Sequence, residues 1–295
     1  MHTILITGKI GQVGWELTRT LAPLGRIIAI DVEEVDFTRP DKIRSFVRDI
    51  PGLKLIVNPA AYTNVDVAED APELAKQINA DAPAVLAEES NRLGIPIIHY
   101  STDYVFDGRK ETSYSETDPT GPLGVYGQTK LEGELAVCSI NPRHFVFRLC
   151  WVYGLRGKNF FLTMLRLAKK NTVPKVVCDQ FGSPTWSRMI AEATALIASN
   201  ALRQHERDDW GIYHLAAGGL TNWHEFATEI FRWANVRHGL TNEEPSAIPG
   251  FEYPTKARRP SFSHLSVEKL ALTFGIRLPD WKEQFNLVCG ENLEV

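Results

Sequence analysis

A glycine-rich segment near the start of the chain, GKIGQVG at residues 8–14, leaves the fewest folds open. It follows a short β-rich run at residues 3–7 and precedes a stretch, residues 13–25, whose apolar residues recur with helical spacing. Glycines three residues apart between a strand and a helix allow a tight turn, close approach to a pyrophosphate and close helix–sheet packing. The segment predicts a dinucleotide site rather than a ligand-free turn, built from Gly8, Gly11, Gln12, Val13 and Gly14.

The rest of the first half continues this alternation of strands and helices. Four further strand-like runs lie at residues 26–31, 53–58, 95–102 and 144–154, and helical stretches cover residues 72–94 and those after Tyr126. Strands separated by helices predict right-handed crossovers and a parallel sheet with helices on both faces. We therefore expect an α/β, doubly wound (Rossmann-type) fold.

The second half is less regular. Helices are expected at residues 160–170, 190–203 and 222–235, the last capped by Asn222, with strands at 173–179 and 211–219. Prolines cluster in a long loop between residues 245 and 260. We expect a dinucleotide-binding domain at residues 1–155, rejoined by parts of the second half, and a smaller, mainly substrate-binding lobe at 156–295.

Composition excludes several functional classes. The net charge of −4 gives no broad basic field for nucleic acid, and no apolar run approaches the roughly 20 residues that cross a bilayer. The N-terminus lacks a basic leader, so we expect a cytoplasmic protein. The four cysteines and eight histidines show no metal-ligand spacing, so no protein-ligated metal is assigned. The oligomeric state is left open, a homodimer included.

Two strand ends extend the cofactor site. Asp31 stands at the end of the second strand, where a carboxylate binds the adenosine ribose and repels a 2′-phosphate; this favours NADH slightly over NADPH, although the nearby Arg39 softens the preference. The third strand ends in Asn58, Ala60 and Ala61, followed by Tyr62. Small side chains there would leave room for a flat cofactor; the alternative is a tightly packed strand end without a ligand.

The segment GVYGQTK, residues 124–130, places Tyr126 and Lys130 one helical turn apart. A nearby cation lowers the pKa of a phenol, which can then donate a proton to a developing alkoxide. The motif is short enough to occur by chance, with an ordinary amphipathic helix as the alternative. Thr102 ends the fourth strand on the same side and would add a hydroxyl for a substrate carbonyl.

Together these motifs resemble the extended short-chain dehydrogenase/reductase family. Within it, GKIGQVGWEL, STDYVFDG, YGQTKLEGE, FRLCWVYG and DQFGSPT resemble the subfamily that reduces dTDP-4-dehydrorhamnose. The resemblance implies an oxidoreductase that uses NADH or NADPH on a dTDP-linked 4-keto-6-deoxy sugar. It implies that Tyr126 is the general acid, that Lys130 holds the nicotinamide ribose and lowers the pKa of Tyr126, and that Thr102 polarises the carbonyl.

The resemblance also implies supporting residues. Asn79 would support the cofactor side from a neighbouring helix, and Arg259 would meet the substrate diphosphate. The sugar pocket would be walled by Asp103, Tyr104, Val105, Phe106, Trp151 and Val152, some of which could equally be core residues. Arg259, with Arg258, could equally form a solvated basic loop.

Some positions separate relatives from one another. Dehydratases of this family carry Asp-Glu after the threonine, whereas Tyr104 follows Asp103 here, and the serine pair of epimerases is missing. Reduction is left. Pro59 departs from the usual small residue, and Arg188 stands where an acidic partner of Glu16 would support magnesium, so magnesium is not supported. The alternatives are a reductase of another nucleotide-linked 4-keto-6-deoxy sugar, and a non-catalytic subunit resembling the regulatory subunit of methionine adenosyltransferase.

Overall fold

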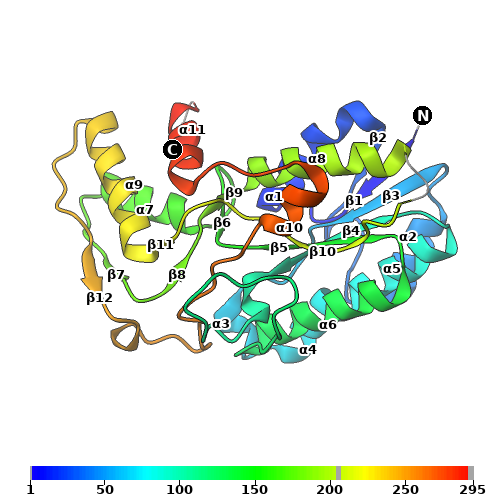
Figure 1. Cartoon of the computed structure of the whole chain (residues 1–295), viewed down its shortest axis with the longest axis horizontal. Helices are drawn as coiled ribbons and strands as arrows, with labels where there is room; N and C mark the ends of the chain where they lie inside the picture. The colour runs from blue at the N-terminus through cyan, green and yellow to red at the C-terminus, as the bar shows by residue number, and fades with distance from the viewer. Residues whose placement is uncertain (1, 204–206, 292–295) are drawn as a thin grey trace.

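The computed structural model describes residues 2–203 and 207–291. A six-stranded parallel sheet runs in the order β10-β5-β4-β3-β1-β2 (Figure 1). Its strands are β1 (Thr3–Ile6), β2 (Arg26–Ala29), β3 (Leu53–Asn58), β4 (Ile97–Thr102), β5 (His144–Leu149) and β10 (Gly211–His214). The strand order reverses between β1 and β3, which opens a crevice at their carboxyl ends. The predicted doubly wound fold is confirmed.

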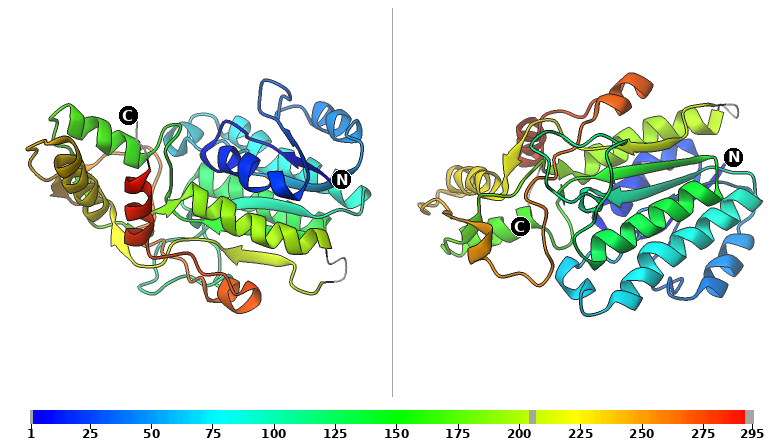
Figure 2. Two further views of the ribbon diagram at one scale, coloured as in Figure 1. Left: turned by 90° about the horizontal axis from the view of Figure 1, so that it is seen from above. Right: turned by 60° about the horizontal axis from the view of Figure 1, so that its bottom comes forward.

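Helices cover both faces of the sheet, as Figure 2 shows. One face carries α1 (Gln12–Thr20) and α8 (Ser187–Arg203), and the other carries α2 (Pro40–Arg48), α5 (Ala82–Arg92) and α6 (Val125–Ile140). Each layer buries its own apolar cluster against the strands, so neither face of the sheet is left to solvent.

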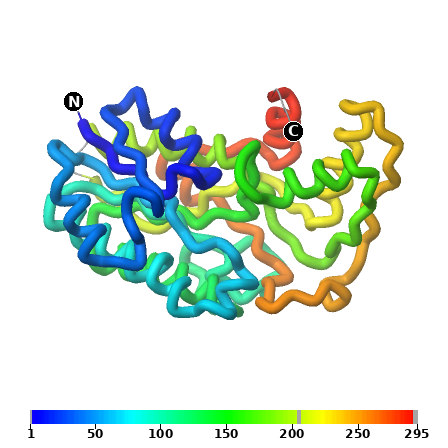
Figure 3. Tube along the Cα trace, turned by 180° about the vertical axis from the view of Figure 1, so that it is seen from behind, coloured from blue at the N-terminus to red at the C-terminus, as the bar shows by residue number. Residues whose placement is uncertain are grey.

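A second body lies beyond the carboxyl ends of the strands (Figures 1 and 3). Helices α7 (Phe160–Lys169), α9 (Trp223–His238) and α11 (Trp281–Gly290) surround a core of their own, centred on Phe226. Three strand pairs edge it: β6 (Val152–Tyr153) with β9 (Thr185–Trp186), β7 (Lys175–Val177) with β12 (Ser246–Ile248), and β8 (Phe181–Gly182) with β11 (Thr221–Asn222). The division at residue 155 stays a prediction.

Local structure departs from the sequence patterns at several places. The expected helix at 72–94 is interrupted: α4 (Pro72–Lys76) passes into a π-helical turn, Gln77–Asp81, before α5. The expected strand at 144–154 breaks after Leu149, because Trp151 adopts a positive φ of 42°. Asn222 caps α9 as predicted, its side chain accepting from the Glu225 N–H.

Several elements were not anticipated: α2, the short α3 (Val65–Ala68), α10 (Glu268–Phe274) and α11. In the part of the chain that is described, no helix combines the length and the apolar character needed to cross a bilayer.

Candidate active site

The glycine-rich turn has the geometry that phosphate binding requires. Gly8 has a φ of 60°, and a Cβ on Gly14 would lie 1.9 Å from the Gly8 carbonyl oxygen. Gly11 is exposed at the N-cap of α1, and no side chain of the described residues caps this helix end. The first N–H groups of α1 therefore face an open cradle that fits a pyrophosphate.

Asp31 lies two residues beyond the end of β2 and is tied to the glycine-rich turn. Its carboxylate accepts from the backbone N–H groups of Ile10, at 3.1 Å, and Val32, at 2.9 Å. Lys9 is ion-paired with Glu34 at the same corner. The carboxylate is only half-buried, so it remains available to a ribose hydroxyl.

At the end of β3, Asn58 is buried rather than open to a ligand. Its amide oxygen accepts from the Thr7 hydroxyl, at 2.5 Å, and its amide nitrogen lies 3.1 Å from His99 Nδ1. Asn58 thus ties β1, β3 and β4 together. Ala60 and Ala61 are half-buried beside the turn, and Ala60 approaches Gly8 so closely that a side chain on Gly8 would collide with it.

Asn79 acts through other residues. It is fully buried in the π-helical turn, where its amide bonds both the N–H and the carbonyl of Tyr62, at 2.8 and 3.1 Å. It also donates to Thr129 Oγ1, at 3.1 Å, on α6. These three hydrogen bonds join the loop after β3 to the helix that carries Tyr126 and Lys130.

Thr102, Tyr126 and Lys130 come together where β4 meets α6. The Thr102 side chain lies beside the Tyr126 phenol, and Lys130 Nζ donates to the Tyr100 carbonyl at 2.6 Å. Burial raises the pKa of Tyr126 to about 12, and the negative charge of Asp103 adds to this rise. The prediction that Lys130 lowers the pKa of Tyr126 is therefore wrong for this arrangement. Burial lowers the pKa of Lys130 to about 8.

Asp103 faces the protein interior. Its carboxylate accepts from the Thr102 hydroxyl at 3.0 Å and from the Cys150 thiol at 3.3 Å, and the Ser263 side chain lies close to it. Burial raises the pKa of Asp103 to about 6. Cys150 and Ser263 escaped the sequence analysis because nothing in their spacing links them to residue 103.

The expected pocket walls divide into two groups. Tyr104 packs edge-on against Tyr126, with ring centroids 5.7 Å apart, and Trp151 stacks on Trp223 at 3.7 Å. Tyr104, Trp151 and Val152 are half-buried, whereas Val105 and Phe106 are fully buried in a core cluster. The last two support the strand end from within the core.

A pocket of about 530 Å³ opens beside these groups. Arg109, Lys110 and Arg259 supply its positive charges, and Asp107, Glu111 and Asp179 supply negative ones. Its apolar surface comes from Leu123, Phe181, Leu220 and Phe262. Burial raises the pKa of Tyr104 and the charge of Arg259 opposes this rise, so Arg259, which lines the pocket, is also near Tyr104. The pocket therefore offers a ligand both charged and apolar contacts, and Arg259 is one of its basic groups.

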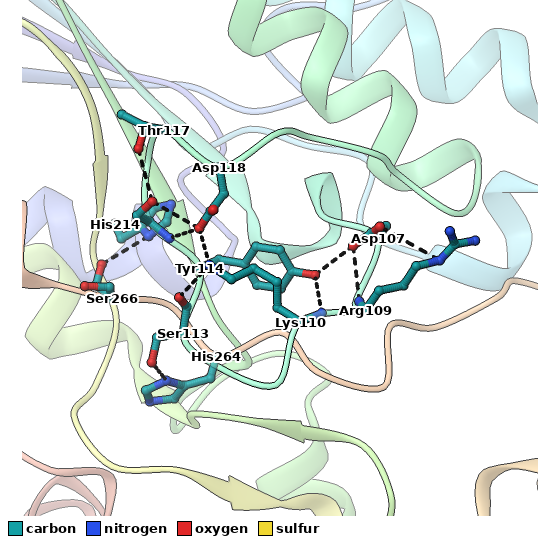
Figure 4. A network of polar contacts seen from close by, with 11 residues as sticks. Asp107, Arg109, Lys110, Ser113, Tyr114, Thr117, Asp118, His214, His264 and Ser266 are labelled. Atoms are coloured by element: carbon teal, nitrogen blue, oxygen red, sulfur yellow. Dashed lines mark hydrogen bonds and ion pairs between the residues drawn. The ribbon is translucent and has the colours of Figure 1, made fainter.

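One wall of this pocket is a loop cross-linked by side chains (Figure 4). Tyr114 donates to Asp107 at 2.7 Å, and Lys110 reaches Asp118 at 2.6 Å. Ser113 bonds His264, at 2.8 Å, from a distant part of the chain. These contacts join the loop to itself and to the segment that carries His264.

The residues around Glu16 do not fit a metal. Burial raises the pKa of Glu16 and the charge of Arg188 opposes this rise. Arg188 bonds Glu192 at 3.2 Å and Glu291 at 2.7 Å. Across residues 2–203 and 207–291, no three His, Cys, Asp or Glu side chains are grouped to hold a metal ion.

Comparison with known proteins gives consistent matches along the chain. The sequence profile described as RmlD substrate binding domain matches residues 1–293. The chain is 47% identical over 284 residues to a dTDP-4-dehydrorhamnose reductase of Burkholderia thailandensis, covering 95% of each chain. It is 46% identical to that of Escherichia coli K12, covering 95% of this chain and 94% of the other. A dTDP-4-dehydrorhamnose reductase structure from Bacillus anthracis, in complex with NADP, superposes with a TM-score of 0.87 at 30% identity, covering 97% of this chain and 98% of that one.

Proposed function

The chain belongs to the family of the RmlD substrate binding domain, and from this membership and the site geometry we propose a specific reaction. The protein is an NAD(P)H-dependent oxidoreductase that reduces the C4 keto group of dTDP-4-dehydro-L-rhamnose, giving dTDP-L-rhamnose. The observation that carries the proposal is that Thr102 and Tyr126 lie side by side at the carboxyl edge of the sheet, as the glycine-rich turn does.

The cofactor side follows from the cradle at α1. Gly8, Gly11 and Gly14 leave the space, and the first N–H groups of α1 supply donors for a pyrophosphate. Asp31 accepts from a ribose hydroxyl, which favours NADH, but a relative was solved with NADP. When bound, the cofactor supplies the hydride that reduces C4.

The protein residues supply the proton and hold the substrate. Tyr126 donates its phenolic proton to the C4 oxygen as negative charge develops there. The phenol is protonated at neutral pH, as a tyrosine normally is, so its proton is available for transfer. Lys130 holds a ribose hydroxyl, and Arg259 meets the diphosphate at the 530 Å³ pocket. The proposal includes a cytoplasmic location and a mainly substrate-binding lobe from residue 156 onward. It also includes a homodimer, which light scattering after size-exclusion chromatography would test.

The test measures cofactor oxidation through the change in nicotinamide absorbance. The protein is mixed with NADH or NADPH and with dTDP-4-dehydro-L-rhamnose made in situ, and the product is compared with dTDP-L-rhamnose by chromatography. Rapid oxidation that yields this product is expected and ranks the two cofactors. Cofactor binding without oxidation would overturn the proposal in favour of another nucleotide-linked keto sugar or a non-catalytic subunit.

A further inference from the structure

Helix α3 lies between two parts of the active site that are distant in sequence. It follows the loop after β3, and Asn64 caps it by accepting from the Val67 N–H. Asp66 lies within this four-residue helix, and Glu69 and Asp70 follow it directly. The three carboxylates point to different partners, and two of those partners belong to the proposed catalytic and substrate-binding groups.

Asp66 fastens the segment that carries Arg259. One carboxylate oxygen accepts from the Ala257 N–H at 3.0 Å, and the other accepts from Arg259 Nη2 at 3.0 Å. Ala257 itself is buried. Arg259 lines the 530 Å³ pocket, and its Nε is buried without a partner among the described residues. A guanidinium carries five N–H donors in a fixed plane, so one carboxylate can orient it and leave donors for an anion.

Glu69 fastens the start of the catalytic helix. The N-cap of α6 is Gly124, which has no side chain, and Glu69 Oε1 accepts from the Val125 N–H at 2.8 Å in its place. A Cβ on Gly124 would lie 2.5 Å from the same oxygen. A carboxylate at a helix N-terminus is stabilised by the unpaired N–H groups. Tyr126 is the residue after Val125, so this cap fixes the first turn that carries the phenol.

We propose that α3 anchors the active site through these two carboxylates: Asp66 positions Arg259 for the substrate diphosphate, and Glu69 positions the first turn of α6 for proton transfer by Tyr126. Both are positioning residues, since each acts through another group. The inference rests on the proposed function for the identity of the substrate, but the contacts themselves do not depend on it.

Asp70 provides a matched control on the same segment. It is ion-paired with Lys256, but both side chains are more than half exposed. Exposed pairs contribute little because water screens them and the side chains lose entropy. Asp70→Asn removes the same charge as Asp66→Asn without touching the pocket or α6.

The experiment measures steady-state kinetics of Asp66→Asn, Glu69→Ala and Asp70→Asn. We expect Asp66→Asn to raise the KM for the nucleotide sugar about five- to tenfold, as expected for a charged hydrogen bond, with kcat and the cofactor KM nearly unchanged. Glu69→Ala should lower kcat about tenfold, near the loss of a helix cap, and Glu69→Gln should restore part of it because its amide oxygen can accept from Val125. Asp70→Asn should match the wild type.

Amide hydrogen exchange separates failure of the inference from failure of the proposed function. Wild-type protein that does not oxidise cofactor with this substrate overturns the function alone. In that case, faster exchange at residues 255–259 in Asp66→Asn and at 124–128 in Glu69→Ala still supports the anchor. Unchanged exchange there, or the same kinetic change in all three variants, overturns it.

Discussion

In the proposed mechanism, Tyr126 is the residue on which the chemistry depends most directly. Replacing it with phenylalanine removes the proton donor and keeps the ring that packs against Tyr104. We expect Tyr126→Phe to bind cofactor normally and to lose turnover by at least about a hundredfold, the lower range for general acid catalysis. Cofactor fluorescence and absorbance assays measure the two effects. Tyr153→Phe is the control, because Tyr153 is buried in the core around Phe226. Wild-type turnover by Tyr126→Phe would contradict the assignment.

Asp103 gives the protein a specific pH dependence. Burial raises the pKa of this carboxyl to about 6, so the folded protein holds a proton that the unfolded chain releases near pH 4. The resulting stabilisation is present at low pH and is lost as the pH rises through about 6. Asp103→Asn cannot ionise at this position, so the variant does not lose this stabilisation as the pH rises. Its free energy of unfolding, relative to wild type, should therefore rise by about 2–3 kcal/mol between pH 4 and 7.

Urea denaturation at several pH values measures this change. Asp36→Asn is the control, because hydrogen bonds from Thr38 lower the pKa of Asp36 and its titration lies below this window. A flat difference for Asp103→Asn across the window would show that the carboxyl titrates normally.

Single residues also mark the limit of sequence reasoning. The positions of Thr102, Tyr126 and Lys130 could be predicted because strand ends and helical spacing are local properties. The environment of Asp103 could not, because Cys150 and Ser263 reach it through tertiary packing. The predicted direction of the Tyr126 pKa shift was wrong for a related reason. The spacing reveals a nearby lysine but not the burial of the phenol, and burial decides the shift.

Among the elements, α1 depends on a glycine within its first turn. Alanine normally stabilises a helix by about 1 kcal/mol relative to glycine. At Gly14 the new methyl group would lie 1.9 Å from the Gly8 carbonyl oxygen, so α1 would have to move away from the turn. We expect Gly14→Ala to lower the free energy of unfolding by about 1–3 kcal/mol, as overpacking does, and to weaken cofactor binding.

Thermal unfolding with and without cofactor measures both effects. Gly290→Ala, at the end of α11, is the control because nothing lies within 4 Å of its added Cβ. It should be neutral or slightly stabilising. The same result for Gly14→Ala would contradict the proposed close packing of α1 on the turn.

Element prediction succeeded where the pattern was local and failed where backbone irregularity intervened. Strand β3 was expected at residues 53–58 and spans Leu53–Asn58. The expected single helix at 72–94 contains a π-helical turn, and Asn79 in that turn bonds to Tyr62 and Thr129. Helix α3 is too short to show a period, although its carboxylates reach both Arg259 and α6.

At the scale of the whole molecule, the sheet and the second body share one chain path. After β5 the chain enters the second body, returns in α8 and β10, leaves in α9, and returns in α10 before ending in α11 (Figure 3). The sequence predicted two halves but not how often the chain crosses between them, because periodicity identifies elements without showing which core they join. This interleaving makes separate unfolding of either half costly.

We therefore expect a single cooperative unfolding transition for both halves. A ligand that binds only the folded state stabilises it by about 2.7 kcal/mol at a hundredfold excess over its Kd. NADPH should bind on the sheet side, and dTDP should bind in the pocket beside Arg259. Each ligand should nevertheless raise the midpoint temperature of the whole transition, because the two cores cannot unfold independently. Differential scanning calorimetry with and without each ligand measures this coupling. Two transitions, of which NADPH moves only one, would show that the halves fold as separate domains.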